Sequence, residues 1–156
     1  EVRNLEKSKK IEIPEPNEIT IIKGRDKYLQ MIKSMIDTAK GEYYLIPGRF
    51  GYPDVTIRAS ILRMLKQKVK LKMIIEEINK DSRGVLKERI ANGAELRVNS
   101  LAGIRLNIKD SSEVLLSIVD PETKDRISIY TTNKAFAESM AHLFDCLWKE
   151  GKKIRF

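Results

Sequence analysis

Histidine and cysteine, which often carry acid–base, nucleophilic and metal chemistry, occur once each in this chain of 156 residues, as His142 and Cys146. A structural zinc site needs four such ligands and an internal disulfide needs two cysteines, so we expect neither. The single cysteine favours a reducing, cytoplasmic setting. A Ser-His-Asp or Cys-His centre could use only His142. On a helical wheel His142 lies about 200° from Met140 and off the apolar stripe, which favours an exposed helix residue over a catalytic base.

A loop dense in turn residues, 47–53, follows an apolar strand pattern and contains Arg49, Phe50 and Tyr52. In open α/β sheets, ligands bind at the carboxyl ends of the strands. Arg49 is suited to hold a carboxylate or phosphate, and the two aromatic rings are suited to wall a pocket. An ordinary turn with an exposed arginine explains the same residues, so the sequence leaves both interpretations open.

Polar side chains also follow the next two predicted strands, Glu76 and Glu77 after one and Asn99 and Ser100 after the other. Either pair could face the same pocket as the 47–53 loop. Polar residues are common at strand ends, however, which favours a solvated surface. Adjacent strand residues point to opposite faces, so the two glutamates do not form a general acid/base pair.

Thr131, Thr132 and Asn133 stand where a predicted strand turns into the last helix. Hydroxyl and amide side chains cap helix N-termini well, and capping is the favoured interpretation. Ligand contact is the alternative, and one residue can do both.

The densest basic run contains Arg63, Lys66, Lys68, Lys70 and Lys72, and the whole chain has a net charge of +8. Such a run could contact phosphates. No aromatic residues interleave with it, so it offers no platform for stacking single-stranded bases. Lysines on a strand also protect it against aggregation, and a solvated surface is the favoured interpretation.

Hydrophobic periodicity predicts helices over 25–40, 55–67, 82–92 and 134–149. Apolar runs predict strands over 43–46, 69–75, 94–98, 114–119 and 127–130, with an alternating pattern around 104–108. We expect Gly41 to end the first helix in a left-handed conformation, and Asp54 and Asp81 to cap the second and third. The last helix has one apolar stripe with further apolar residues beside it: Phe136, Met140, Leu143 and Leu147, flanked by Ala137, Phe144 and Trp148.

The order of these elements predicts an α/β fold. The first hundred residues alternate helix and strand, which is typical of a parallel sheet with crossover helices. The turn at 120–125 joins two strands directly, so the second part need not be parallel. We therefore expect a mixed, largely parallel sheet with helices on both faces.

Three stretches together resemble the phospholipase D-like domain, and more narrowly the C-terminal part of TrmB-type archaeal transcription regulators. They are Ile-Asp-Thr-Ala-Lys (36–40) before Tyr-Tyr-Leu-Ile-Pro (43–47), Val-Leu-Leu-Ser-Ile-Val-Asp (114–120), and Tyr-Thr-Thr-Asn-Lys-Ala-Phe-Ala-Glu (130–138) leading to Leu-Phe-Asp-Cys-Leu-Trp (143–148). The resemblance covers about residues 19–150 and implies half of a phospholipase D-like protein.

Catalytic members of that superfamily carry His-x-Lys-x4-Asp on one strand. In this chain Glu113 stands in the histidine place and Leu115 in the lysine place, and only Asp120 matches. The family's histidine attacks phosphorus and its lysine stabilises phosphoryl charge. A carboxylate would repel a phosphodiester and leucine has no charge, so the departure argues against phosphodiesterase activity.

The family's second motif, Gly-Ser-x-Asn, is also altered. Tyr130 and Thr131 replace its first two residues, and Asn133 matches. We therefore expect a protein that is not an enzyme.

The resemblance implies a domain organisation. Residues 1–18, with Pro14 and Pro16, are interpreted as a linker from a missing N-terminal winged-helix domain, and residues 19–156 as a phospholipase D-like sensor and dimerisation domain. We expect a homodimer that acts on DNA through the missing domain. No apolar run approaches the roughly 20 residues that cross a bilayer, so no membrane partner is expected.

The expected effector pocket is bounded by the 47–53 loop and the 130–133 strand end. It would bind an unknown small molecule, without cofactor or metal, through residues at these strand ends: Arg49, Tyr52, Asn133, Thr131 and Glu76. The alternatives are a phosphodiesterase or nuclease of the phospholipase D superfamily with displaced catalytic residues, and a nucleic-acid-binding module.

Overall fold

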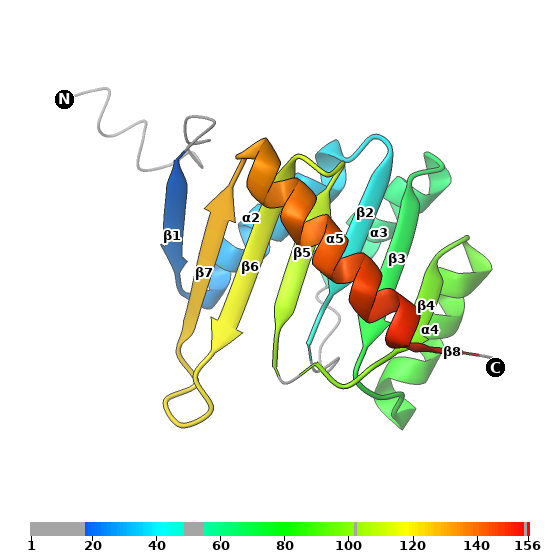
Figure 1. Ribbon diagram of the computed structural model, residues 1–156. Coiled ribbons are helices and arrows are strands. Elements are labelled where there is room, and N and C mark those ends of the chain that lie inside the picture. The colour runs from blue at the N-terminus through cyan, green and yellow to red at the C-terminus, as the bar shows by residue number, and fades with distance from the viewer. Residues whose placement is uncertain (1–17, 49–54, 102, 155) are drawn as a thin grey trace.

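A mixed eight-stranded sheet with helices on both faces forms the framework of this computed structural model (Figure 1). The structure describes residues 18–48, 55–101, 103–154 and 156. The elements follow one another as β1 (Ile19–Lys23), α2 (Arg25–Thr38), β2 (Glu42–Ile46), α3 (Val55–Lys66), β3 (Lys70–Ile75), α4 (Lys80–Ala91), β4 (Glu95–Val98), β5 (Arg105–Lys109), β6 (Glu113–Val119), β7 (Arg126–Thr131), α5 (Lys134–Glu150) and β8 (Lys152–Lys153).

The strands lie in the order β1-β7-β6-β5-β2-β3-β4-β8. β3 lies parallel to β2 on one side and to β4 on the other, and the other neighbouring pairs of described strands are antiparallel. The predicted mixed α/β sheet is confirmed, but it is mainly antiparallel rather than largely parallel. The reason is that short connections join β5 to β6 and β6 to β7, and such connections reverse the chain.

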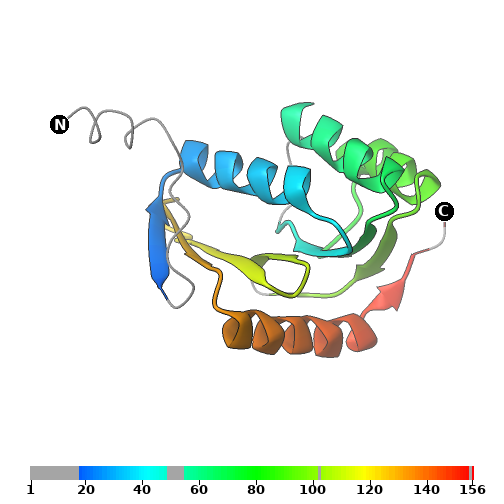
Figure 2. The ribbon, with the colours of Figure 1, turned by 90° about the horizontal axis from the view of Figure 1, so that it is seen from above.

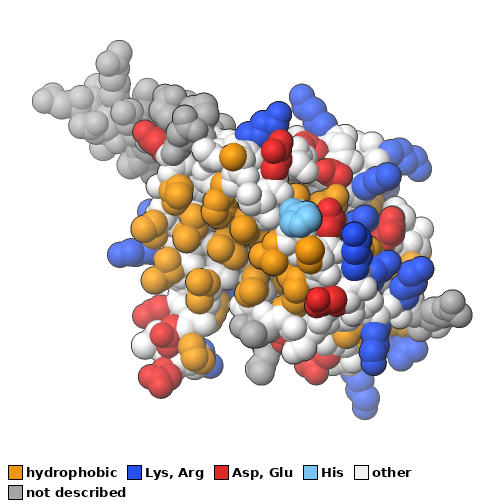
Figure 3. All heavy atoms as spheres, in the orientation of Figure 1, with side chains coloured by type: hydrophobic (Ala, Val, Ile, Leu, Met, Phe, Trp, Pro, Cys, Tyr) orange, Lys and Arg blue, Asp and Glu red, His pale blue; other side chains and the backbone are white. Residues whose placement is uncertain are grey.

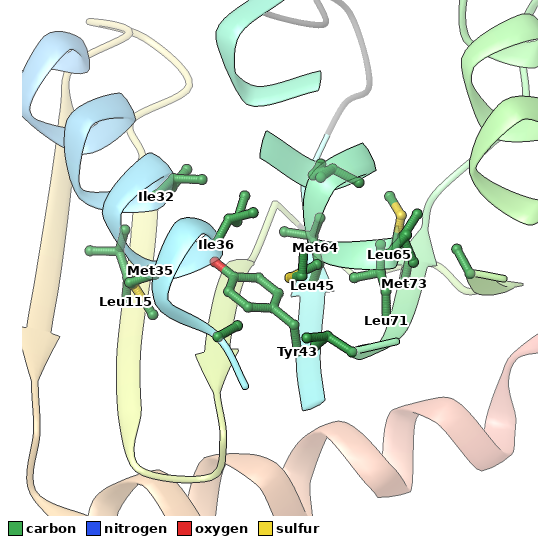
Figure 4. Packing of buried hydrophobic residues seen from close by; sticks show 14 of the residues in the cluster. Ile32, Met35, Ile36, Tyr43, Leu45, Met64, Leu65, Leu71, Met73 and Leu115 are labelled. Carbon is green, nitrogen blue, oxygen red and sulfur yellow. The ribbon is translucent and has the colours of Figure 1, made fainter. Parts of the chain in front are cut away.

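Helices α2, α3 and α4 cover one face of the sheet and α5 crosses the other (Figure 2). Between α2, α3 and the sheet lies a closely packed apolar cluster (Figure 4). In it, Met35 of α2 and Tyr43 of β2 are fully buried, as are Leu71 and Met73 of β3. The helical period predicted from residue 25 onward therefore identifies the buried face of α2 correctly.

Helix α5 packs on the opposite face through a stripe of four residues: Ala137, Ala141, Phe144 and Trp148. The Phe144 ring stacks on Tyr44, with ring centroids 4.6 Å apart, and lies 6.0 Å from the ring of Trp148. Leu143, which we expected on the central stripe, is 42% exposed. The predicted stripe is therefore displaced by one residue, because the buried row runs i, i+4, i+7, i+11 from Ala137.

Two predicted helix boundaries differ from the structure. Helix α2 ends with an extended cap at Ala39, and Gly41 is not in the left-handed region. Helix α4 is capped by Asn79, whose side chain accepts a hydrogen bond from the Ser82 amide, so Asp81 lies inside the first turn. Asp54 lies outside the described residues.

Within the described part of the chain, no helix has the length and apolar character needed to cross a membrane.

Replacing Phe144 by alanine tests the α5 packing. Because Phe144 is fully buried and stacked on Tyr44, Phe144→Ala should lower the free energy of unfolding by about 3–5 kcal/mol in urea titrations. Glu138→Ala, on the exposed side of the same helix, is the control and should change it by no more than about 0.5 kcal/mol. Equal effects of the two substitutions would show that α5 does not pack as described.

Candidate functional site

Strand direction sorts the candidate residues onto two edges of the sheet. β2 and β6 start at the upper edge in Figure 1, where β7 ends; β2 and β3 end at the lower edge, where β5 and β7 start. These are called the upper and lower edges below.

Glu113, in the place of the family's histidine, lies at the upper edge in a closed hydrogen-bond network. Its Oε2 lies 2.8 Å from Lys109 Nζ, and its Oε1 accepts a hydrogen bond of 2.5 Å from the Tyr130 hydroxyl. Lys109 also donates to Thr38 Oγ1 at 2.8 Å. Both side chains of the ion pair are about 15% exposed. The carboxylate is thus neutralised and engaged by side chains of the protein itself.

The other altered motif positions belong to the core. Leu115 is fully buried and Tyr130 is 1% exposed, both in the cluster beneath α2. Burial raises the pKa of Tyr130, and the Glu113 carboxylate that accepts its hydrogen bond raises it further. Tyr130 therefore stays a neutral hydrogen-bond donor at physiological pH.

Asp120, the one matching residue of the first motif, lies in the β6–β7 turn. Its Oδ1 accepts hydrogen bonds from the amides of Glu122 and Thr123, at 2.8 and 2.9 Å. It follows the last residue of β6, so it lies at the lower edge, away from Glu113. Its local role is to shape the turn.

Thr131 and Asn133 build the start of α5. Thr131 Oγ1 donates to the Glu18 carbonyl at 2.9 Å and accepts from the Asn133 amide at 3.0 Å. The Asn133 side chain accepts from the Phe136 amide at 2.9 Å, as an N-cap does. The capping interpretation of Asn133 is confirmed.

The expected pocket between the end of β2 and the end of β7 is wrong in one respect. β7 ends at the upper edge and β2 at the lower edge, because β2 and β6 run in the same direction and β7 runs against them. Thr131 and Asn133 therefore cannot share a pocket with residues at the end of β2. Arg49 and Tyr52 lie outside the described residues.

Glu76 lies at the lower edge, directly after β3. Its Oε1 accepts a hydrogen bond of 3.3 Å from the Gly103 amide and so ties the end of β3 to the turn before β5. Asn99, after β4, donates to the Leu147 carbonyl at 3.0 Å and holds the end of α5. Both side chains have structural partners.

The basic run does not form one stripe. Arg63 pairs with Asp37 of α2 at 3.3 Å. The ammonium group of Lys72 lies 5.3 Å from the ring centroid of Trp148, on the opposite face of the sheet. His142, the predicted solvent-facing residue, is exposed on α5. Within the described ranges no three His, Cys, Asp or Glu side chains are grouped so that they could hold a metal ion.

Asp110 fixes the upper edge. Its carboxylate accepts hydrogen bonds from the amides of Lys40, Gly41 and Glu42, at 3.0, 2.7 and 3.0 Å. Partial burial opposes ionisation, but these backbone hydrogen bonds outweigh it and hold the pKa of the Asp110 carboxyl below its usual value. The start of β2 is thereby attached to the β5–β6 connection.

The structure also brings together three arginines that the sequence analysis did not single out. Arg25 starts α2, Arg105 starts β5 and Arg126 starts β7. The Arg126 guanidinium lies 4.1 Å from the ring centroid of Tyr28. These residues are far apart in sequence, so no local spacing marks them. Only the strand directions bring them together at the lower edge.

Of the comparisons with known proteins, only the one with solved structures identifies the fold. No protein-family model matches the chain, and no curated protein matches it. Among solved structures it is similar to Nuc from Salmonella typhimurium, a phospholipase D family member, with a TM-score of 0.74 and 18% identity over 89% of this chain and 99% of that one. It is similar to NucT from Helicobacter pylori, with a TM-score of 0.73 and 10% identity over 88% of this chain and 99% of that one.

It is also similar to TrmBL2, an archaeal chromatin protein that shows a novel mode of DNA binding, with a TM-score of 0.71 and 19% identity. That match covers 90% of this chain but only 55% of TrmBL2. The chain therefore has a phospholipase D-like fold, shared by proteins of different activities.

Replacing Asp110 by asparagine tests the upper edge. Asp110→Asn should lower the free energy of unfolding at pH 7 by about 1 kcal/mol, because it removes the negative charge that strengthens the hydrogen bonds to these backbone amides. The effect should be no larger because partial exposure already weakens such hydrogen bonds. The folded pKa lies below the unfolded value of about 3.9, so the stabilisation is present above that value and is lost as pH falls through the folded pKa. The difference between variant and parent should therefore shrink in urea titrations below about pH 4.

Asp125→Asn, at an exposed position in the β6–β7 turn, is the control. A difference for Asp110→Asn that is constant between pH 7 and pH 3 would contradict the role given to its charge.

Proposed function

We propose that the chain is an effector-sensing and dimerisation module of a transcription regulator, with a phospholipase D-like fold and no phosphodiesterase activity. The observation that carries the proposal is that the side chains in the places of the catalytic histidine and lysine are engaged within the protein. Glu113 is bonded to Lys109 and Tyr130, and Leu115 is buried in the core. The residues that would perform catalysis in a phospholipase D enzyme serve stability here.

The chemistry supports this assignment. Phosphodiester cleavage in the superfamily needs a nucleophile with access to phosphorus and positive charge on the phosphoryl oxygens. Among the described residues, Lys109 is the cation that pairs with Glu113, and this pairing neutralises its charge. His142 is exposed on α5, where its Nε2 lies 4.0 Å from Cys146 Sγ.

An apolar surface supports self-association. Beside α5, the strands β1, β7 and β6 present isoleucines on the same face, where Ile118 stands opposite Ile127 and Ile21 opposite Ile129. Ile21, Ile118 and Ile127 are 62%, 60% and 52% exposed. Figure 3 shows apolar side chains gathered over these strands and continuing toward α5. This surface is called the isoleucine face below.

A second copy of the chain is the proposed occupant of the isoleucine face. Contiguous exposed apolar surface marks an interaction site, and a two-fold axis through it would bury the same residues of both copies. Lysines and arginines gather mostly away from this face in Figure 3, so two copies would meet there without strong repulsion between like charges. A symmetric dimer also suits regulators that act on two-fold operators through attached winged helices.

Two alternatives remain open to experiment. The match to nearly all of Nuc favours a phosphodiesterase as the second candidate. Direct binding of duplex DNA by this domain is less well supported, since the cations of the basic run point to different faces. A cytoplasmic location follows from the proposed function.

Catalytic silence is tested with an activated phosphodiester. The chain should hydrolyse bis(p-nitrophenyl) phosphate, DNA and phosphatidylcholine no faster than buffer, since Glu113 and Lys109 are paired with each other and Leu115 is uncharged and buried. Cleavage that co-purifies with the chain and is abolished by Glu113→Gln or His142→Ala would establish the enzyme alternative instead.

Self-association is tested by light scattering at micromolar concentration. The parent chain should have twice the mass of one chain, and Ile118→Arg should reduce it to a monomer because it places a charge in the isoleucine face. Val55→Arg is the control, since Val55 is 79% exposed on α3, across the sheet. This variant should remain a dimer. A monomeric parent, or a dimer insensitive to Ile118→Arg, would remove the isoleucine face from the proposal.

A further inference from the structure

Three guanidinium groups converge at the lower edge because of the sheet topology. β5 and β7 both run against β6, so Arg105 and Arg126 start strands at the same edge. β1 runs against β7 and pairs Lys23 with Ile127, so it delivers Arg25, at the start of α2, to that edge as well. The cluster of Arg25, Arg105 and Arg126 is called the arginine cluster below.

The positive charges are close enough to interact. Arg126 lies over the Tyr28 ring at 4.1 Å. Burial lowers the pKa of Arg126, and the charges of Arg105 and Arg25 lower it further. Arg105 and Arg126 are half-buried, whereas Arg25 is exposed. The cluster is thus recessed on one side and open to solvent on the other.

These charges have no carboxylate partner among the described residues. The ion pairs among those residues involve other cations, namely Lys33, Arg58, Arg63 and Lys109. Uncompensated like charges held together cost free energy, and proteins accept this cost where an anion relieves it. Glu76, which follows β3 at the same edge, accepts a hydrogen bond from the Gly103 amide at 3.3 Å.

The surroundings of the arginine cluster offer further hydrogen-bond donors. Asn107 is fully buried, and its Nδ2 has no hydrogen-bond partner, while its Oδ1 accepts from the Tyr43 hydroxyl at 2.7 Å. Burial raises the pKa of Tyr28, and the side chains of Asn107 and Arg126, which both lie near its hydroxyl, lower it in part, so the Asn107 amide lies beside the cluster. Buried polar atoms are rarely left unpaired in native structures.

The start of α2 adds to the same positive field. Its N-cap is Gly24, which has no side chain that could cap the first amides, and its first turn holds Arg25 and one acidic residue, Asp26. The first amides of a helix lack intrahelical partners and favour a negative group.

We propose that the arginine cluster binds the phosphate monoester of a small-molecule effector. Guanidinium groups match phosphate oxygens in pairs, and three of them suit a dianion better than a single carboxylate. This inference rests on the proposed sensor function and names the chemical class of its effector. It moves the effector site to the edge where β2 and β3 end and away from Thr131 and Asn133.

The site is tested by thermal shift on the full chain, with inorganic phosphate and glycerol 3-phosphate as probes and chloride at equal ionic strength as reference. Both probes should raise the melting temperature in a saturable way that chloride does not reproduce. Arg105→Gln and Arg126→Gln should each raise the dissociation constant for both probes at least about tenfold. Arg58→Gln removes the same charge from α3 and should leave it unchanged.

Arg25→Gln guards against misfolding, because Arg25 is exposed. It should keep the parent melting temperature without phosphate and still weaken binding several-fold. Equal responses to phosphate and chloride, or equal affinities in Arg25→Gln, Arg126→Gln and Arg58→Gln, would overturn the site. A duplex oligonucleotide that binds more tightly than the monoester through these arginines would overturn the small-molecule assignment.

The outcomes also separate this site from the proposed function. Phosphate binding by a monomeric chain with phosphodiesterase activity would leave the site standing and remove the regulator. A catalytically silent dimer that ignores both phosphate probes would remove the site alone.

Discussion

The reversal of strand direction between β2 and β5 decides where every functional candidate of this protein lies. The Asp110 carboxylate holds this junction, because it joins the β5–β6 connection to the amides that precede and begin β2. Asp110 and Ser111 both have a φ of 50°, a left-handed conformation that aspartate tolerates better than most residues. Once β5 runs against β2, the meander β5–β6–β7 sends Glu113 and Asn133 to the upper edge and Arg105 and Arg126 to the lower edge.

The two edges differ in how their charges are satisfied. At the upper edge, Glu113, Lys109, Tyr130 and Thr38 satisfy one another. At the lower edge, like charges are held together around Tyr28 and form no ion pair with a carboxylate among the described residues. A closed hydrogen-bond network stabilises the fold, whereas a cluster of positive charges without counter-ions favours the binding of an anion. The contrast is the basis for proposing that a catalytic fold serves here as a sensor.

Local patterns predicted the elements well and their arrangement less well. The period of Tyr28, Ile32, Met35 and Ile36 identified the buried face of α2, and apolar runs identified β2, β3 and β6. β1 was not predicted as a strand, since it pairs with β7, over a hundred residues away. The pocket between the ends of β2 and β7 was wrong because strand direction depends on remote pairing. The arginine cluster had no local signature for the same reason, although two of its members start strands.

A map of backbone amide chemical shifts during titration with glycerol 3-phosphate would test the central claim most directly. We predict that amide chemical shifts move around Arg25, Arg105 and Arg126 at the lower edge. The amide shifts of Glu113, Tyr130 and Asn133 at the upper edge should stay unchanged. Changes centred on Glu113 and Asn133 would contradict this prediction, because they would show that the edge of the family's catalytic motif still receives the phosphoryl group.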